Sequence, residues 1–382
     1  MHFFDLFSQL LTKGCIALLT GYLAFSGFAA SSLQHHLARL RWIEASDTPL
    51  LATADTPTTP QGAKKSSFTY IPSRYTIGDK IPRILLDNLP YQEAAVAGAG
   101  SSQTKDSTTT TDIKDALVNI FCTYREGKQF NAITGSGAFI DSKGIILTNA
   151  HVAQFLLLTG KRENAQCVIR QGNPAEEKYV ADLLYISPAW IHENAALITS
   201  KKPSGTGERD YALLYVTKAI KGPLPPSFPA LKLNSIPLTE KDQGSVVLAA
   251  GYPADMFSTE GPRASLVPKV ANTTISQLFT FGTGDADVMA LHDSVVGEHG
   301  SSGGPILTKE GVDEGLIVTR GDEKDGAHSL HALTLSYINK TIREETGYNL
   351  ATTLEGNISR RSEIFKKALV PFLTSLLESE LH

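Results

Sequence analysis

The sequence has few cysteines and lacks the spacings of common metal-binding motifs. It contains 3 cysteines among 382 residues, and neither a Cys-x-x-Cys nor a His-Glu-x-x-His spacing occurs. Such spacings are typical of zinc sites. We therefore expect no metal and no other cofactor.

Basic residues are not concentrated in any part of the chain. Lysine and arginine together number 35 against 39 aspartates and glutamates, which gives a formal net charge of −4. Nucleic-acid-binding proteins usually carry a basic patch. The composition therefore argues against nucleic acid as a partner.

Formal charge is missing altogether between Lys13 and Arg39, and residues 15–30 are mostly apolar. This length is near the upper limit for a signal-peptide core and slightly short for a spanning helix. We predict that residues 1–30 are a signal peptide or an uncleaved anchor. A buried helix of a soluble protein is the alternative.

Parts of residues 31–112 are poor in bulky apolar side chains. Two stretches, 56–65 and 94–111, are rich in Thr, Ser, Gly, Ala and Pro and cannot pack a core. We interpret residues 31–112 as a low-complexity stalk or pro-segment. We expect the part of the chain after residue 112 to lie outside the cytoplasm, whether the protein is secreted, periplasmic or attached to a membrane through residues 14–34.

The motif Gly300-Ser301-Ser302-Gly303-Gly304-Pro305 places hydroxyl groups between glycines. Glycine permits unusual φ values and close approach of the backbone. A serine on such a turn can attack a carbonyl while backbone N–H groups stabilise the oxyanion. Taken alone, the motif also fits a common surface loop.

A candidate base and a candidate acid lie upstream. The run 134–152 reads as two strands joined by a Ser-Lys-Gly turn, which leaves His151 at the end of a buried strand. Asp210 stands just before an apolar strand, where a carboxylate can accept the Nδ1–H bond of a histidine. Considered alone, His151 could be an ordinary hydrogen-bonded histidine without a catalytic role. Asp210 alone could be a carboxylate at a strand edge or a cap.

Together these segments resemble the trypsin-like (chymotrypsin-fold) serine peptidases, especially the bacterial branch that includes the HtrA proteases. The resemblance covers roughly residues 113–340 and follows the family's order of His, Asp, Ser. Its specific parts are Thr148-Asn149-Ala150-His151, Asp210 with Ala212-Leu213-Leu214, and the Gly300 to Pro305 motif.

The resemblance implies a serine endopeptidase that hydrolyses protein or peptide substrates through an acyl-enzyme. Ser302 would be the nucleophile, His151 the general base and Asp210 the orienting carboxylate. The backbone N–H groups of Gly300 and Ser302, with Ser301 between them, would form the oxyanion hole. Digestive members carry Asp at position 301, so activation by that salt bridge is not expected here.

The resemblance also implies where substrate binds. Thr319, Arg320 and Gly321 would lie on the strand that lines the specificity pocket, with Thr319 where the family often has a serine supporting the carboxylate. The base of the pocket would lie near Val296. No acid stands there, so we expect a small or medium apolar residue before the cleaved bond.

Asp182 is the alternative acid, because it lies closer to His151 along the chain, as in shorter family members. Residues 178–186 read better as the strand before the carboxylate loop, and the longer interval to Asp210 fits an insertion around residues 191–207.

Two other functions fit parts of the pattern. A peptide-binding pseudoprotease would use the edge at 318–321 for strand addition. An α/β-hydrolase-type esterase would use Gly300-x-Ser302-x-Gly304 as its nucleophile elbow. The esterase lacks room for strand and helix units before its candidate partners, which are Asp322, Asp325, His328 and His331.

From residue 112 onward, short apolar runs alternate with turns. We predict an all-β fold of two six-stranded antiparallel barrels, at about 113–220 and 239–340, joined by a proline-rich linker at 218–237. The expected strands are 117–124, 133–140, 145–148, 166–170, 179–186 and 211–216, then 245–250, 265–279, 288–291, 305–307, 315–319 and 329–335.

Residues 341–382 are expected to form a C-terminal helical segment. Apolar residues between 362 and 381 recur at helical spacing, and Pro371 should kink the helix. No PDZ module fits after the second barrel, unlike in the HtrA pattern. The oligomeric state cannot be deduced from these patterns.

Cys122 and Cys167 fall on strands expected to be neighbours in the first barrel. In an exported domain, two such cysteines could form a disulfide. Two buried thiols are the alternative.

Overall fold

The computed structural model describes residues 69–70, 113–126, 129–162, 165–200, 206–254, 266–282, 284–292, 294–297, 299–320 and 330–381. The predicted signal peptide or anchor at 1–30, and nearly all of the predicted stalk, lie outside these ranges. Within them, no helix has the length and apolar character needed to cross a membrane.

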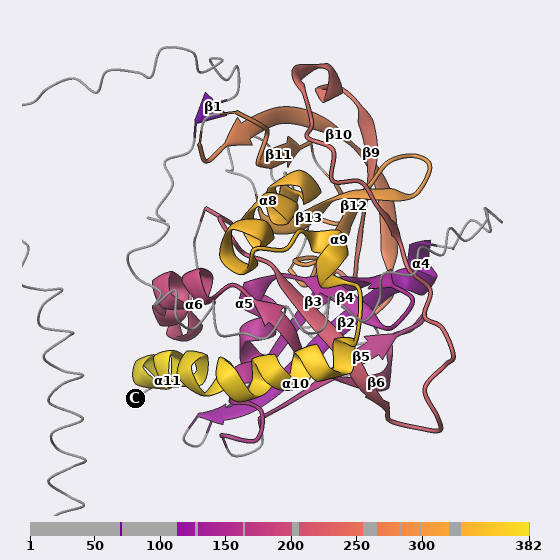
Figure 1. Cartoon of the computed structure of the whole chain (residues 1–382). Helices are drawn as coiled ribbons and strands as arrows, with labels where there is room; N and C mark the ends of the chain where they lie inside the picture. The colour runs from indigo at the N-terminus through magenta and orange to yellow at the C-terminus, as the bar shows by residue number, and fades with distance from the viewer. Residues whose placement is uncertain are drawn as a thin grey trace, which may run out of the picture. The chain divides into compact units, whose positions relative to one another are not determined.

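Six antiparallel strands close into the first barrel (Figure 1), in the order β2-β3-β4-β7-β6-β5 and back to β2. Closure leaves no unpaired strand edge. The strands are β2 (Leu117–Glu126), β3 (Gln129–Asp141), β4 (Ile145–Thr148), β5 (Gln166–Gln171), β6 (Glu176–Ile186) and β7 (Ala212–Ala219).

The second barrel is also a closed antiparallel ring, in the order β9-β10-β11-β14-β13-β12 and back to β9. Its strands are β9 (Val246–Gly251), β10 (Lys269–Thr280), β11 (Val288–Leu291), β12 (Pro305–Leu307), β13 (Val312–Arg320) and β14 (Leu330–Thr334). The predicted all-β fold of two six-stranded barrels is thus confirmed. The α/β-hydrolase alternative does not fit, because it requires a mostly parallel sheet with helices between its strands.

Two short parallel strands were not expected. β1 (Thr69–Tyr70) pairs with the end of β10, so a piece of the predicted stalk lies along the second barrel. β8 (Lys232–Leu233) pairs with β13 and belongs to the predicted linker. The sequence gives no alternating pattern for strands of two residues, so only the tertiary structure identifies them.

Short helices lie before β2, between strands of the first barrel, and between the two barrels. They are α4 (Ile113–Ala116), α5 (Ala150–Ala153), α6 (Pro188–Asn194) and the 3-10 helices η1 (Gln154–Leu158), η2 (Ala195–Thr199) and η3 (Glu240–Asp242). Most of α6 and all of η2 fall in the predicted insertion at 191–207.

The single C-terminal helix expected from the sequence is four helices: α8 (Leu335–Thr346), α9 (Leu350–Thr353), α10 (Ile358–Ala368) and α11 (Val370–Glu380). α8 starts immediately after β14, before the boundary expected at residue 341. Pro371 falls in the first turn of α11, where its missing N–H is not needed. The predicted kink is therefore a break between two helices.

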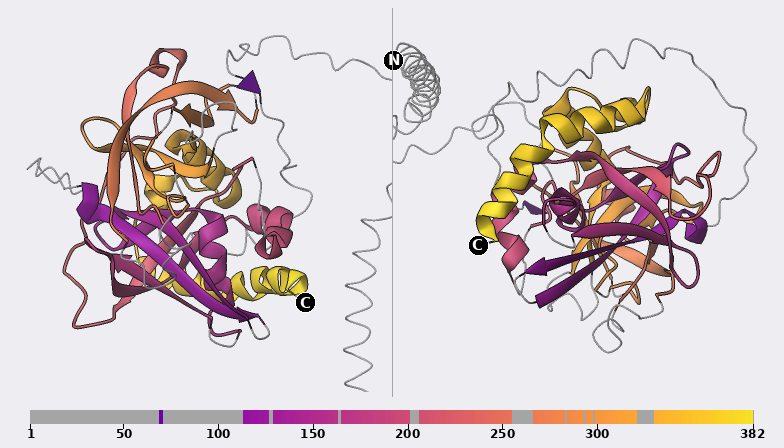
Figure 2. Two further views of the ribbon diagram at one scale, coloured as in Figure 1. Left: turned by 180° about the vertical axis from the view of Figure 1, so that it is seen from behind. Right: turned by 90° about the horizontal axis from the view of Figure 1, so that it is seen from below.

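α10 and α11 cover one side of the first barrel, where Figure 2 shows them as the yellow helices ending at the C-terminus. Phe365, Leu373 and Leu377 are fully buried in the same apolar cluster as the barrel core. Ser362 Oγ donates a hydrogen bond of 2.9 Å to the carbonyl of Leu183 on β6. The C-terminal segment is thus an integral part of the folded unit.

Cys122 on β2 and Cys167 on β5 are directly opposite each other, with Cα atoms 4.0 Å apart. Their sulfur atoms are joined in a disulfide. The bond links two neighbouring strands of the first barrel covalently.

Candidate active site

His151 is held where a buried strand passes into a helix. All four residues of β4 are buried, and Asn149 separates this strand from α5. His151 is the second residue of α5, and its side chain is 34% exposed. A rigid strand end therefore carries an imidazole that still reaches solvent.

Asp210 contacts His151 through both carboxylate oxygens. Oδ1 accepts the backbone N–H of His151 at 2.8 Å, and Oδ2 lies 2.6 Å from Nδ1 of the ring. An ionised carboxylate only accepts hydrogen bonds, so Nδ1 is the donor. In the neutral imidazole this leaves Nε2 without a proton, as a general base requires.

Burial and charge act in opposite directions on the imidazole. Burial lowers the pKa of His151, because the imidazolium is poorly solvated, but the charge of Asp210 and its hydrogen bond favour the imidazolium. The second effect is larger, and the pKa of His151 lies above its ordinary value of 6.5.

The alternative acid, Asp182, lies on β6 and has a different partner. Lys366 of α10 donates to its Oδ2 at 3.1 Å in a surface ion pair. The structure therefore brings Asp210, and not Asp182, to His151.

The serine turn packs against the first barrel. Ser136 on β3 donates its backbone N–H to the carbonyl of Ser302 at 2.7 Å. Gly303 has a φ of +88°, and a Cβ there would lie 2.1 Å from the Ser136 carbonyl oxygen and 2.5 Å from Thr148 Oγ1. Only glycine fits, and the turn reaches the end of β4, three residues before His151.

Backbone donors on this turn divide into two groups. The N–H groups of Gly303 and Gly304 donate to carbonyls of Ile317 and Ser301, each at 2.9 Å. Those of Gly300, Ser301 and Ser302 donate no hydrogen bond within the described part of the chain. Because buried N–H groups are normally paired, three consecutive free donors are suited to an anionic oxygen.

Ser302 is half-buried. Among the contacts of the described residues, no hydrogen bond joins it to His151. Hydrogen bonds between catalytic groups are often long before substrate binds. The catalytic roles of these residues stay predictions.

Residues predicted to bind substrate are only partly described. Val296 is fully buried in the apolar cluster of the second barrel, whereas Val295 beside it is 61% exposed. Thr319 and Arg320 end β13, but their side chains lie outside the described part, and so does Gly321. The pocket assignment therefore stays a prediction.

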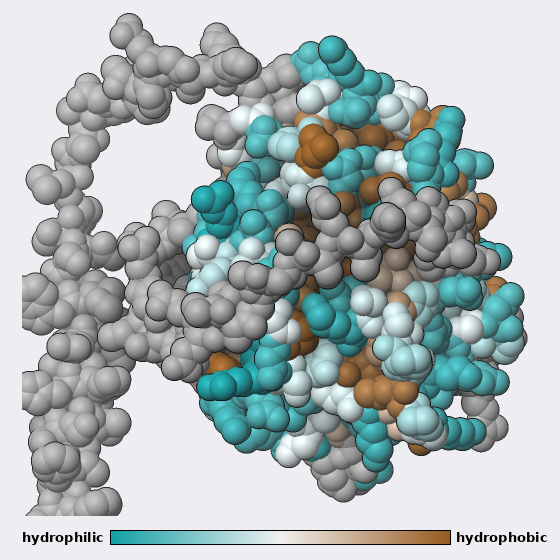
Figure 3. Space-filling view, turned by 45° about the vertical axis from the view of Figure 1, so that its right-hand side comes forward, coloured by the Kyte–Doolittle hydropathy of each residue, from teal (hydrophilic) through white to brown (hydrophobic). Residues whose placement is uncertain are grey.

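Apolar side chains at the surface are few and scattered in sequence. On the face shown in Figure 3, hydrophilic side chains predominate and apolar ones emerge between them in several places.

Within the described ranges, no group of three or more His, Cys, Asp or Glu side chains is arranged to hold a metal ion.

Ser136 was not singled out from the sequence. Its Oγ donates to the carbonyl of Gly300 at 2.7 Å and accepts the N–H of Tyr252 at 2.8 Å. It thus joins the serine turn to both barrels. The available signal was its place between Gly135 and Gly137, which marks close approach of another backbone.

Comparisons with known proteins found a similar family model and a similar solved structure. No curated protein sequence matches the chain. One similar solved structure, described as the Rv3671c protease in an inactive form, has 19% identity, covers 61% of this chain and 89% of its own, and has a TM-score of 0.35. A sequence model of the trypsin-like peptidase domain matches residues 135–313, which include His151, Asp210 and Ser302. The chain therefore carries a trypsin-like peptidase domain.

Proposed function

We propose that this chain is a serine endopeptidase with a triad of His151, Asp210 and Ser302. The observation that carries the proposal is the double contact of Asp210 with His151. That contact selects the tautomer in which Nε2 can take a proton and holds the ring in one orientation.

The reaction begins when His151 Nε2 removes the hydroxyl proton of Ser302 as Oγ bonds to the carbonyl carbon of the substrate. The carbonyl oxygen becomes an oxyanion, and the free N–H groups of residues 300–302 support its stabilisation. The imidazolium then gives its proton to the amine nitrogen as the C–N bond breaks, which leaves an acyl group on Ser302.

Deacylation repeats these steps with water. His151 takes a proton from water as the water oxygen attacks the acyl carbon. The proton then returns to Ser302 Oγ as the acid product leaves. Asp210 stays ionised throughout and stabilises the imidazolium in both steps.

The proposed substrates are proteins or peptides, with a small or medium apolar residue before the cleaved bond. Support comes from the absence of an acidic residue at 295–297, where the resemblance locates the pocket base. A peptide library screened for cleavage tests this, and a profile dominated by lysine and arginine contradicts it.

We further propose that the peptidase domain acts outside the cytoplasm, as a secreted, periplasmic or anchored protein. The uncharged apolar run and a disulfide in the first barrel support this. Intact-mass measurement of the exported protein distinguishes a cleaved signal peptide from an anchor through residues 14–34.

Labelling with a serine-directed phosphonate tests the catalytic assignment. We expect the wild-type protein to gain one phosphonyl group and Ser302→Ala to gain none. Ser301→Ala is the matched control, because its buried hydroxyl has no hydrogen-bond partner and its backbone N–H is retained. It should label like the wild type.

The pseudoprotease alternative predicts the opposite result. A folded wild-type protein that binds peptides but neither reacts with the phosphonate nor cleaves any library member would be a binding module.

A further inference from the structure

Arg209, the residue before Asp210, has an unusual backbone conformation. Its φ is +57°, and within the described ranges it is the one non-glycine residue with a positive φ. This left-handed conformation is unfavourable for a residue with a side chain. The surrounding structure must therefore hold the loop in place.

The guanidinium of Arg209 is buried and paired with α8. Nη1 lies 2.6 Å from Glu345 Oε1, and Nη2 lies 2.9 Å from Glu344 Oε2. Burial lowers the pKa of Arg209, but Glu345 and the neighbouring tyrosines together raise it by more, so the side chain stays charged. Because the guanidinium is a planar fork held between two carboxylates, both the position and the orientation of the Arg209 side chain are fixed.

Glu345 is itself fixed by groups from the first barrel. Ser187 Oγ donates to Oε1 at 2.9 Å, and the hydroxyl of Tyr185 on β6 donates to Oε2. The buried carboxylate thus has partners on both oxygens. Leaving any of these donors unpaired would cost stability.

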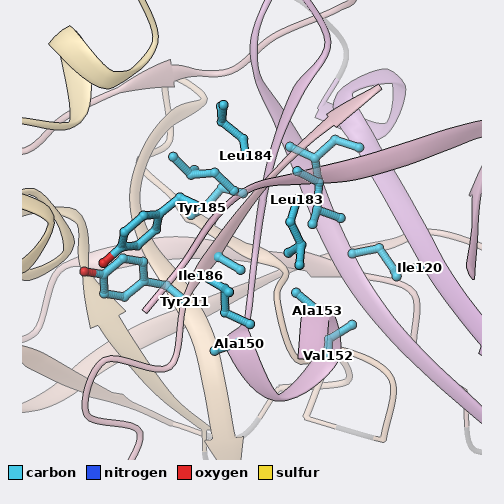
Figure 4. Close-up of a cluster of buried hydrophobic side chains, with 14 of the residues drawn as sticks. Ile120, Ala150, Val152, Ala153, Leu183, Leu184, Tyr185, Ile186 and Tyr211 are labelled. Atoms are coloured by element: carbon cyan, nitrogen blue, oxygen red, sulfur yellow. The ribbon is translucent and has the colours of Figure 1, made fainter. Parts of the chain in front are cut away.

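The residue after Asp210 is held by the same helix. Tyr211 shares a hydrogen bond of 2.8 Å with Thr341 Oγ1 of α8. Its ring stacks on Tyr185 with centroids 6.0 Å apart, and Figure 4 shows the two hydroxyl groups pointing to the same side. Both chain neighbours of Asp210 are therefore fastened to α8.

We propose that Arg209 and Glu345 are positioning residues for Asp210. Through the ion pair, α8 holds the 209–211 backbone in the conformation that directs both Asp210 oxygens at His151. The inference rests on the proposed function for its catalytic consequence, although the positioning itself concerns only Asp210 and His151.

Glu344 and Glu345 are the carboxylates that the described contacts pair with Arg209, and three tyrosines lie near it. Burial raises the pKa of Tyr185, Tyr211 and Tyr337, so these phenols stay protonated. Variants that preserve the charge at positions 209 and 345 therefore add or remove no charge near His151, so they act on it through the position of Asp210.

The test compares Arg209→Lys and Glu345→Asp. Each keeps its charge, but lysine lacks the guanidinium fork and aspartate is shorter than glutamate by one methylene group. In a Ser302→Ala background, the His151 ring is titrated by NMR, and the Nδ1 proton signal of the His–Asp hydrogen bond is recorded. We expect the pKa of His151 to fall and the Nδ1 proton signal to weaken.

With Ser302 present, the same variants should lower kcat about 100-fold with little change in KM, the size of effect expected from slight misplacement of a catalytic group. Lys340→Met is the matched control. It removes the other ion pair of α8, between Lys340 Nζ and the buried Asp287 at 2.8 Å, which does not touch the 209–211 loop. It should lower stability while the pKa of His151 and kcat stay unchanged.

The inference is overturned if Arg209→Lys or Glu345→Asp lowers stability but leaves the His151 titration, the proton signal and kcat as in the wild type. If one variant fails to fold, the other decides. A protein that cleaves no peptide yet shows the expected NMR changes would retain the positioning role and lose the proposed function.

Discussion

The backbone N–H of Ser136 and the carbonyl of Ser302 are joined by a hydrogen bond of 2.7 Å that crosses from the first barrel to the second. This bond places the candidate nucleophile beside β3, which pairs with β4, the strand that ends just before His151. The contact tolerates no side chain at the next residue, Gly303, because the two backbones meet there.

Gly303→Ala should therefore damage both fold and site. The new Cβ would overlap the Ser136 carbonyl oxygen at 2.1 Å, and the φ of +88° adds strain. We expect a loss of roughly 3 kcal/mol in the free energy of unfolding and near-complete loss of peptidase activity. Urea denaturation and peptide cleavage measure the two effects.

Gly222→Ala is the control for the conformational cost alone. Gly222 has a φ of +72°, but no atom lies within 4 Å of its added Cβ. It should lose about 1 kcal/mol and keep full activity. Equal losses in both variants would mean that the Ser136 contact adds nothing.

Asp210→Asn should lower turnover by about 10⁴-fold while the fold is retained, because the amide stabilises the wrong tautomer of His151. Asp182→Asn removes only a surface ion pair with Lys366 and should leave turnover unchanged. Steady-state kinetics on one peptide compares them. Near-full activity of Asp210→Asn would remove Asp210 from the triad.

Peptidase activity should rise with pH as His151 loses its proton. Because Asp210 raises the pKa of His151, the midpoint should lie above 6.5. A pH profile of kcat/KM measures it, and a flat profile from about pH 5 to pH 8 contradicts a histidine base.

The same shift has a consequence for stability. Since the pKa of His151 is higher in the folded than in the unfolded state, the charged pair with Asp210 stabilises the fold fully below about pH 6.5. This contribution disappears as pH rises through the folded-state pKa. Urea unfolding of Ser302→Ala at several pH values should show the decline, and His151→Gln should lack it.

Removing the disulfide should destabilise the first barrel. The bridge closes a loop over a sequence separation of 45 residues. The double variant Cys122→Ala, Cys167→Ala should lose about 2–4 kcal/mol of unfolding free energy, because its unfolded chain is less restricted. Reductant should lower the urea midpoint of the wild type but not of the variant.

The strands and motifs that are specified by a few consecutive residues could be predicted from the sequence. β4, β11 and β12 have the predicted bounds, and the other barrel strands differ by a few residues at their ends. Periodicity and turn residues specify these strands, and the His151, Asp210 and Ser302 motifs each lie within a few consecutive residues. The choice of Asp210 over Asp182 relied on strand assignment, and the hydrogen bonds with His151 agree with it.

The contacts of Arg209 could not be predicted from the sequence. Arg209 reads as an exposed charge beside a strand, because charged side chains are seldom fully buried. Nothing near it indicates Glu345, which is 136 residues away. The break before α11 was missed for a local reason, since a proline fits a first helical turn as well as a kink.

The pairing of Arg209 with Glu345 also bears on when the molecule can become active. A chain is made from its N-terminus, and the carboxylate that fastens the acid loop emerges 136 residues after the arginine. A nascent polypeptide that already displays His151, Asp210 and Ser302 still lacks that fastening until α8 has been synthesised. If the chain is the peptidase proposed above, its activity would therefore begin only once α8 has been made.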